Sequence, residues 1–129
     1  MKPTTIPAYH ATLSPSDRAI CEVLRDRIDA GLSEGVSKMW HANPVTFLNE
    51  NPVVGYSKLK TCVRLFFWSG QSFTTPGLTP SGSFKAAEVR YTDVSQIDQD
   101  ALTAWLAEAR EVQWDYKNIT RNKGRLTRL

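Results

Sequence analysis

Residues 39–70 read MWHANPVTFLNENPVVGYSKLKTCVRLFFWSG. Three breaks, at 43–44, 49–52 and 58–60, divide this stretch into four short apolar runs. A proline pushes the residue before it out of the helical region, and runs of β-branched and aromatic residues between such breaks are typical of strands. The stretch therefore predicts an antiparallel meander, with strands near 37–42, 45–48, 53–57 and 62–68.

The last of these runs, 62–68, is apolar on nearly both of its faces. A strand that is apolar on both faces belongs in the middle of a sheet, where neither face meets solvent. We therefore place it centrally, and we expect one further strand near 84–91.

Helix signals stand on either side of the strands. Ser14 is a candidate N-cap followed by Pro15 at the first helical position, and the apolar residues that follow recur at helical spacing up to Gly31. A closing helix is expected to begin at Asp98. Its predicted buried stripe consists of Leu102, Trp105, Leu106, Ala109, Val112 and Tyr116. The predicted fold is an α+β two-layer domain, in which an N-terminal and a C-terminal helix flank an antiparallel sheet of about five strands.

The chain of 129 residues is long enough for one domain with its own core. We divide this single domain, 1–129, into an N-terminal arm at 1–13, a long loop at 69–83 and a basic tail at 118–129. Loops of this length are often binding loops, and Phe73 and Leu78 are expected to anchor this one. The tail is expected to be a frayed, solubilising end.

The N-terminus has no apolar run typical of a signal peptide, and no segment approaches the ~20 apolar residues of a membrane span. Only Cys21 and Cys62 are present, so no disulfide framework is encoded. These features predict a cytoplasmic, soluble protein with reduced thiols and no membrane partner.

Five segments together resemble the YdhG-like family of small bacterial domains of unknown function. They are residues 40–45, 54–56, 63–73, 84–91 and 114–118, and the similarity covers roughly residues 14–120. One member of that family is described as a frataxin-like intracellular iron chaperone. The resemblance therefore implies ferrous iron as the ligand and an iron-acceptor protein as a partner, with no catalytic motif to carry across.

Three carboxylates of the first helix bear on the iron hypothesis. Glu22, Asp26 and Asp29 fall on one helix face, and carboxylates are suitable ligands for ferrous iron. However, Arg18 and Arg25 each precede one of these acids by four residues, which is the pattern of a solvated, ion-paired face. Both interpretations stay open at this point.

The predicted strands also carry many aromatic side chains. These residues either form core or line a pocket for a small flat or apolar ligand, with His41, Arg64 or Arg90 as its polar anchor. The candidate ligand-binding residues are Trp40, His41, Tyr56, Arg64, Trp68 and Arg90.

On the closing helix, Trp114 is expected to face away from the buried stripe, with Arg110, Lys117 and Arg121 on its side. Such a group is suited to stacking on a base, to a partner protein, or to the body of the same chain. The chain outside the five basic residues that follow Asp115 has 11 basic and 13 acidic residues, and it contains no recognition motif. Both facts argue against nucleic acid.

His41 and Cys62 form the only candidate base and nucleophile, but no acid is placed to orient the histidine and no hydrolase or phosphate-loop motif is present. We therefore expect a binding or chaperone module rather than an enzyme. Intracellular iron handling is the first hypothesis, and a small-ligand or protein-interaction domain using the aromatic sheet face is the alternative.

Overall fold

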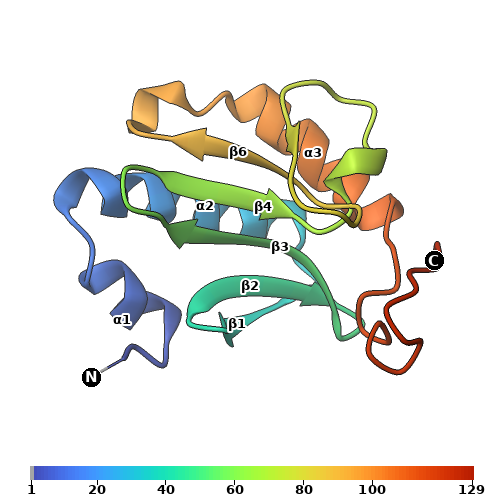
Figure 1. Cartoon of the computed structure of the whole chain (residues 1–129). Helices are drawn as coiled ribbons and strands as arrows, with labels where there is room; N and C mark the ends of the chain where they lie inside the picture. The colour runs from blue at the N-terminus through green and yellow to red at the C-terminus, as the bar shows by residue number, and fades with distance from the viewer. Residues whose placement is uncertain (1) are drawn as a thin grey trace.

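A computed structural model describes residues 2–129 of the chain (Figure 1). Its helices and strands are α1 (Ile6–Ala11), α2 (Pro15–Gly31), β1 (Val36–Trp40), β2 (Asn43–Leu48), β3 (Asn51–Lys58), β4 (Val63–Phe67), β5 (Thr79–Pro80), β6 (Ala87–Tyr91) and α3 (Gln99–Glu111). Within residues 2–129 the strands form one antiparallel six-stranded sheet in the order β1-β2-β3-β4-β6-β5. The predicted α+β class is confirmed, and β4 lies inside the sheet as expected.

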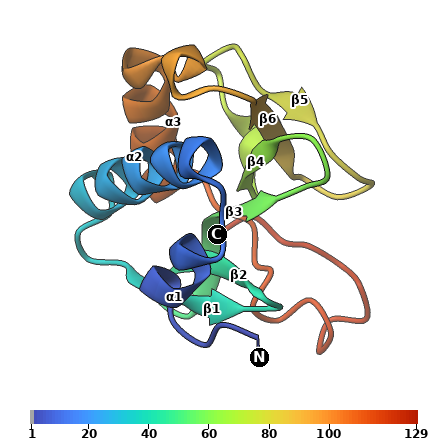
Figure 2. The ribbon, with the colours of Figure 1, turned by 90° about the vertical axis from the view of Figure 1, so that its left-hand side faces the viewer.

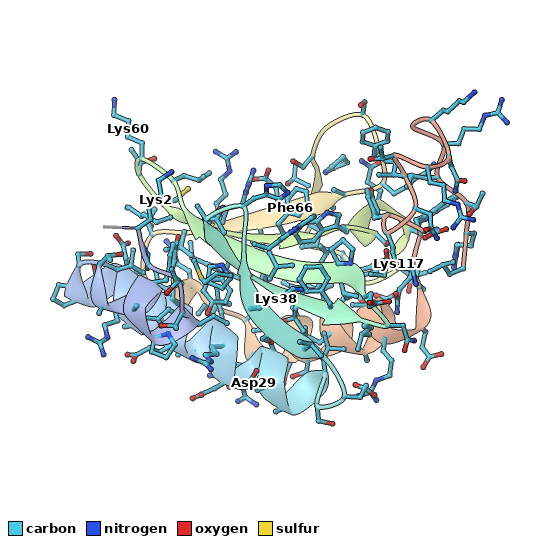
Figure 3. All side chains as sticks on the ribbon, turned by 90° about the horizontal axis from the view of Figure 1, so that it is seen from below. Lys2, Asp29, Lys38, Lys60, Phe66 and Lys117 are labelled. Atoms are coloured by element: carbon cyan, nitrogen blue, oxygen red, sulfur yellow. The ribbon has the colours of Figure 1, made fainter. Side chains whose placement is uncertain are left out.

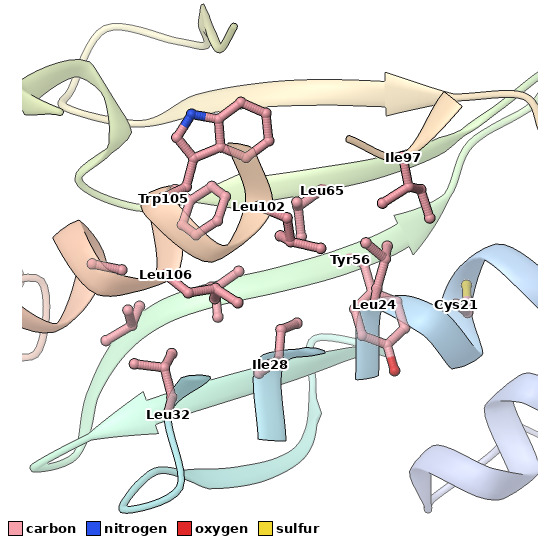
Figure 4. Packing of buried hydrophobic residues seen from close by; sticks show 14 of the residues in the cluster. Cys21, Leu24, Ile28, Leu32, Tyr56, Leu65, Ile97, Leu102, Trp105 and Leu106 are labelled. Carbon is pink, nitrogen blue, oxygen red and sulfur yellow. The ribbon is translucent and has the colours of Figure 1, made fainter. Parts of the chain in front are cut away.

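Helices α2 and α3 lie on the same side of the sheet. Figure 2 shows this helix layer and the sheet edge-on. Their apolar stripes meet the inward side chains of β3 and β4, as the close view of Leu24, Tyr56, Leu65 and Leu106 shows (Figure 4). The largest fully buried side chain is Phe67. The opposite face of the sheet carries no helix within the described part of the chain, and Figure 1 looks onto it.

The sheet differs from the prediction in detail. Strands β2 and β3 begin at Asn43 and Asn51, two residues earlier than expected, because the extended conformation that a proline imposes on its predecessor is also the strand conformation. The turns between strands are instead His41-Ala42 and Asn49-Glu50, where all four residues have positive φ. Two-residue turns of this kind match the twist of a hairpin.

The N-terminal arm contains a short helix, α1, which the sequence analysis did not predict. Thr5 caps this helix, and Ile6, Tyr9 and His10 are buried. His10 Nε2 and Tyr56 Oη lie at hydrogen-bond distance, 2.7 Å apart, and the Lys58 backbone N–H donates to Tyr9 Oη. Burial lowers the pKa of His10, and the nearby positive charge of Arg25 lowers it further. Met1, the first residue of the predicted arm, lies outside the described residues.

Helix α3 begins after Asp98, as predicted, but it ends at Glu111. The predicted stripe is therefore correct through Ala109, whereas Tyr116 lies beyond the helix. Hydrogen bonds to distant segments explain the early end, because Trp114 donates its backbone N–H to Ser69 Oγ and Asp115 donates to the Thr127 carbonyl. These tertiary bonds replace the helical ones.

The same bonds fold the basic tail back on the domain, so it is not a frayed end. Trp114 forms an isolated antiparallel bridge with Arg128, and turns occupy much of 117–124. The long loop is likewise structured. It contains the short strand β5, which is the sixth strand that the sequence did not predict, and Phe73 and Leu78 pack against the core as expected.

Glu108 of α3 holds the loop at Thr74 and Thr75. Its carboxylate accepts the Thr74 N–H at 2.7 Å, the Thr74 hydroxyl at 2.9 Å and the Thr75 N–H at 3.0 Å. Partial burial alone would raise the pKa of Glu108, but the hydrogen bonds from Thr75 and Thr74 outweigh this and lower it to about 2. The loop is therefore attached to an ionised carboxylate over the whole neutral range.

Glu108→Gln is expected to lower the free energy of unfolding by about 1 kcal/mol at pH 7, since charge-assisted hydrogen bonds at a partly exposed site contribute roughly that much. The folded pKa lies below the ordinary value of 4.5, so this stabilisation is fully present above about pH 4.5 and is lost as the pH falls toward about 2. Urea unfolding of both proteins across this range is the measurement, with the exposed Glu111→Gln as the control. A difference between wild type and Glu108→Gln that did not shrink on acidification would contradict this account.

Candidate functional site

The open face of the sheet is the outstanding surface of the molecule. Side chains on this face point away from the helix layer, as Phe66 does relative to Asp29 of α2 in Figure 3. Antiparallel sheets commonly leave one face to solvent, and that face is then usually polar. Here it is aromatic, with rings from β1, β2 and β4 and from the residue that follows β4.

A cavity of about 200 Å³ opens on this face. It is lined in part by Trp40, His41, Val45, Gly55, Arg64, Phe66 and Trp68. Position 55 requires glycine because neighbouring atoms approach its backbone closely. A Cβ placed there would lie 2.8 Å from the Pro44 carbonyl oxygen and 3.4 Å from the Trp68 ring. The missing side chain lets the indole of Trp68 lie close to β3 and form one wall.

The aromatic walls support one another. Trp68 meets Phe66 edge to face, with ring centroids 4.8 Å apart, and its centroid lies 6.2 Å from that of Trp40. Trp40 in turn contacts His41 at 4.3 Å and Phe47 at 5.4 Å. Edge-to-face pairs of this kind stabilise ring positions beyond simple burial. The rings are thus held in place, while Trp40 stays 37% exposed.

Arg64 is the polar group of the cavity. Its Cζ lies 5.0 Å from the Phe66 ring centroid, and its Nη1 lies 3.9 Å from Glu88 Oε1. Its Nε is buried and has no hydrogen-bond partner among the described residues. A buried donor without an acceptor is costly, and such a group in a native structure calls for an explanation.

Glu88 faces Nη1 of Arg64 rather than its Nε, and its other carboxylate oxygen accepts from Arg90. Arg90 Nε donates to Glu88 Oε2, which is the shorter of the two ion pairs that Glu88 makes. Burial by itself would raise the pKa of Glu88, but the hydrogen bond from Arg90, supported by the charges of Arg90 and Arg64, lowers it. Glu88 is therefore ionised and already neutralised beside the cavity.

The structure brings together most of the predicted ligand-binding residues. Trp40, His41, Arg64 and Trp68 line one cavity. Tyr56 also borders the cavity, but its ring is buried in the core and its hydroxyl meets His10. Arg90 does not line it, since it pairs with Glu88 beside a shallow hollow next to β5. Whether a ligand binds there stays a prediction.

Several lining residues were not among the candidate ligand-binding residues, including Phe66 and Gly55. The two-residue alternation of a strand does put Phe66 on the same face as Arg64 and Trp68, as the structure shows. The close approach at Gly55 had no sequence signal, because it arises only when Trp68 packs near a different strand.

The carboxylates proposed for iron lie on the exposed face of α2. Glu22 pairs with Arg18 at 3.5 Å and Asp29 pairs with Arg25 at 3.7 Å. Within residues 2–129 no group of three or more His, Cys, Asp or Glu side chains is arranged to hold a metal ion. Iron at Glu22, Asp26 and Asp29 stays a prediction, and these contacts give it no support.

The predicted cluster around Trp114 does not share a helix face, because α3 ends before Trp114. Arg110 donates to the Gly31 carbonyl and to Glu34, while Lys117 Nζ reaches the Asn49 carbonyl. Trp114 donates its indole N–H to Ser72 Oγ at 3.0 Å and carries Lys85 over its ring at 4.6 Å. The helical premise is therefore wrong for this group, including Arg121, and Trp114 contacts the body of its own chain.

The remaining chemistry-bearing residues lie elsewhere. His41 packs against Trp40 with the two rings tilted by 57°, and Cys62 is buried at the β3–β4 turn. The second thiol, Cys21, is buried in the core, and burial raises its pKa to about 12. A protonated, buried thiol is a poor nucleophile.

No known family model matches this chain, and neither a curated protein nor a solved structure gives a significant match. The resemblance to the YdhG-like family thus stays a prediction. In the part of the chain that the structure describes, none of the helices has both the length and the hydropathy needed to cross a membrane. The aromatic cavity on the open face is the feature that bears most directly on function.

Proposed function

We propose that this protein is a binding module for a small planar ligand that carries an anionic or hydrogen-bond-accepting group. The ligand would occupy the cavity between Trp40, Phe66 and Trp68. The observation that carries the proposal is Arg64, which lines this cavity and whose buried Nε lacks an acceptor among the described residues. A ligand oxygen would satisfy that donor.

The walls of the cavity favour a flat ligand. Trp68 and Phe66 stand almost perpendicular to each other, with an interplanar angle of 82°, so a flat ring can lie against one while it meets the edge of the other. Ligand pockets typically combine such apolar walls with a few convergent polar groups. His41 and Arg64 are those groups here.

The charge of the cavity favours an anion. Arg64 retains its positive charge, whereas the carboxylate nearest to it is engaged by Arg90. A carboxylate or phosphate that reached Arg64 would form a charge-assisted hydrogen bond, which is stronger than a neutral one. The aromatic surroundings strengthen this bond by excluding water.

Titration calorimetry with 2-naphthoate tests the proposal, because this probe joins a planar ring to a carboxylate. Arg64→Met is expected to weaken binding by about 10- to 100-fold, since hydrogen bonds to charged groups contribute roughly 1.5–3 kcal/mol. The neutral probe 2-naphthamide should bind wild type more weakly than 2-naphthoate, and Arg64→Met should remove that difference.

Arg18→Met is the matched control, because it removes an exposed arginine on α2 and should leave the affinity unchanged. Equal binding of both probes by wild type, or equal effects of the two arginine variants, would show that the cavity does not recognise an anion through Arg64.

A further inference from the structure

A second, larger hollow continues the aromatic cavity across the open face. It measures about 520 Å³ and shares Trp40, His41 and Trp68 with the first cavity. Its other side is formed by the folded-back tail, which lies beside the open face in Figures 1 and 2. The residues that line this hollow but not the first cavity include Lys38, Phe47, Phe84, Tyr116 and Lys117.

We propose that the two hollows together bind single-stranded nucleic acid. One unpaired base would lie in the first cavity and a neighbouring base in the second, on either side of the Trp40–Trp68 pair. This inference rests on the proposed function, because the first base is the planar ligand of the aromatic cavity. It names the ligand class and adds the second hollow to the site.

Aromatic rings are available for both bases. Phe84 is 47% exposed and its ring centroid lies 6.5 Å from that of Tyr116, while Trp40, which lines both hollows, is 37% exposed. Proteins that bind single strands stack successive bases on such rings, and each stacked base contributes roughly 1–3 kcal/mol.

The charges beside the rings are suited to a phosphate backbone. Arg64 lines the first cavity, and Lys38 and Lys117 line the second, together with one carboxylate, that of Glu50. Lys38 Nζ lies 4.8 Å from the Phe47 ring centroid, so this cation lies among the aromatic residues of the second hollow. Cations interleaved with aromatic rings are the usual composition of a single-strand groove.

The acidic residues that argued against nucleic acid binding in the sequence lie mainly on the helices. Helices α2 and α3 carry seven acidic and four basic residues, whereas the rest of the chain carries six acidic and twelve basic residues. Apart from the five basic residues that follow Asp115, the 11 basic and 13 acidic residues of the chain therefore combine an acidic helix layer with a basic remainder. A polyanion would therefore be repelled by the helix layer and attracted to the side of the sheet and tail.

The geometry selects single strands over duplexes. The rings that would stack lie in recessed hollows on the face of a sheet, and only unpaired bases can enter such hollows. A duplex keeps its bases stacked on one another, so it offers only phosphates to this surface. Duplex binding should therefore be weak and independent of the aromatic residues.

The test uses fluorescence anisotropy of a labelled oligothymidylate of about eight nucleotides, which lies within the range that one small domain binds. Phe84→Leu is expected to weaken oligonucleotide binding by about tenfold and to leave 2-naphthoate binding unchanged. The slope of the logarithm of the binding constant against the logarithm of the salt concentration measures the number of phosphate contacts. The double variant Lys38→Gln/Lys117→Gln should reduce the size of this slope by about 1.4, since each lost phosphate contact contributes ~0.7.

The matched control is Lys60→Gln combined with Lys123→Gln, which removes the same charge from exposed residues that line neither hollow. Equal effects of the two double variants, or tighter binding of a duplex than of the single strand, would overturn the inference. Naphthoate binding without any oligonucleotide binding would also overturn it, while leaving the proposed function intact. Loss of both would remove the proposed function as well.

Discussion

Replacing Phe67 by alanine is expected to lower the free energy of unfolding by about 3–5 kcal/mol, the usual effect of truncating a buried phenylalanine. Phe67 is 0% exposed in β4, and its ring contacts those of Phe73 and Trp105, at centroid distances of 5.5 and 6.1 Å. The resulting cavity would lie where the sheet, α3 and the long loop meet. Urea denaturation measures the change.

Phe66 offers a matched control one residue earlier in the same strand. Because successive side chains of a strand point to opposite faces, Phe66 lies on the open face and is only half-buried. Phe66→Ala should change the unfolding free energy by less than about 1 kcal/mol, while it weakens binding of 2-naphthoate. If the two alanine variants were equally destabilised, the assignment of core and ligand faces in β4 would be wrong.

Replacing Asn51 by alanine is expected to cost about 2–4 kcal/mol and to release the tail. Asn51 is 2% exposed, and its carboxamide donates to Gln113 Oε1 and to the Trp114 carbonyl while accepting from the Lys117 N–H. Alanine would leave these groups without a partner in a partly buried place. Hydrogen exchange of residues 113–129 should become faster than in the wild type.

Gln113→Ala separates this effect from a general loss of polar contacts. It removes only one of the three partners, since Asn51 Nδ2 keeps the Trp114 carbonyl. We expect a cost below about 1 kcal/mol and a tail that stays protected. Unchanged protection of the tail in Asn51→Ala would show that this side chain does not hold it.

The tail also carries one side of the second hollow. The hydroxyl of Tyr116 accepts the Lys85 N–H at 3.0 Å, and both Tyr116 and Lys117 line that hollow. Asn51→Ala should therefore weaken oligothymidylate binding and leave 2-naphthoate binding near its wild-type value. The two probes thus report separately on the two hollows.

Local sequence was sufficient for the elements whose signals are short-range. Ser14 and Pro15 start α2, Gly31 ends it and Asp98 caps α3, as the capping rules predict. The apolar character of both faces of 62–68 correctly placed β4 inside the sheet. The aromatic and cationic residues of the open face were also recognisable, although Tyr56 was assigned to the ligand while its ring belongs to the core.

Tertiary structure alone decided the C-terminal third and the shape of the site. Helical spacing continues past Glu111, but the bonds from Trp114 and Asp115 to Ser69 and Thr127 end the helix there. Among the described residues the Nε of Arg64 likewise has no acceptor, while the neighbouring Glu88 accepts from Arg90. Spacing along the chain reports which face a side chain is on, whereas partners far apart in sequence meet only after the chain has folded, and those partners determine which polar groups remain free to bind.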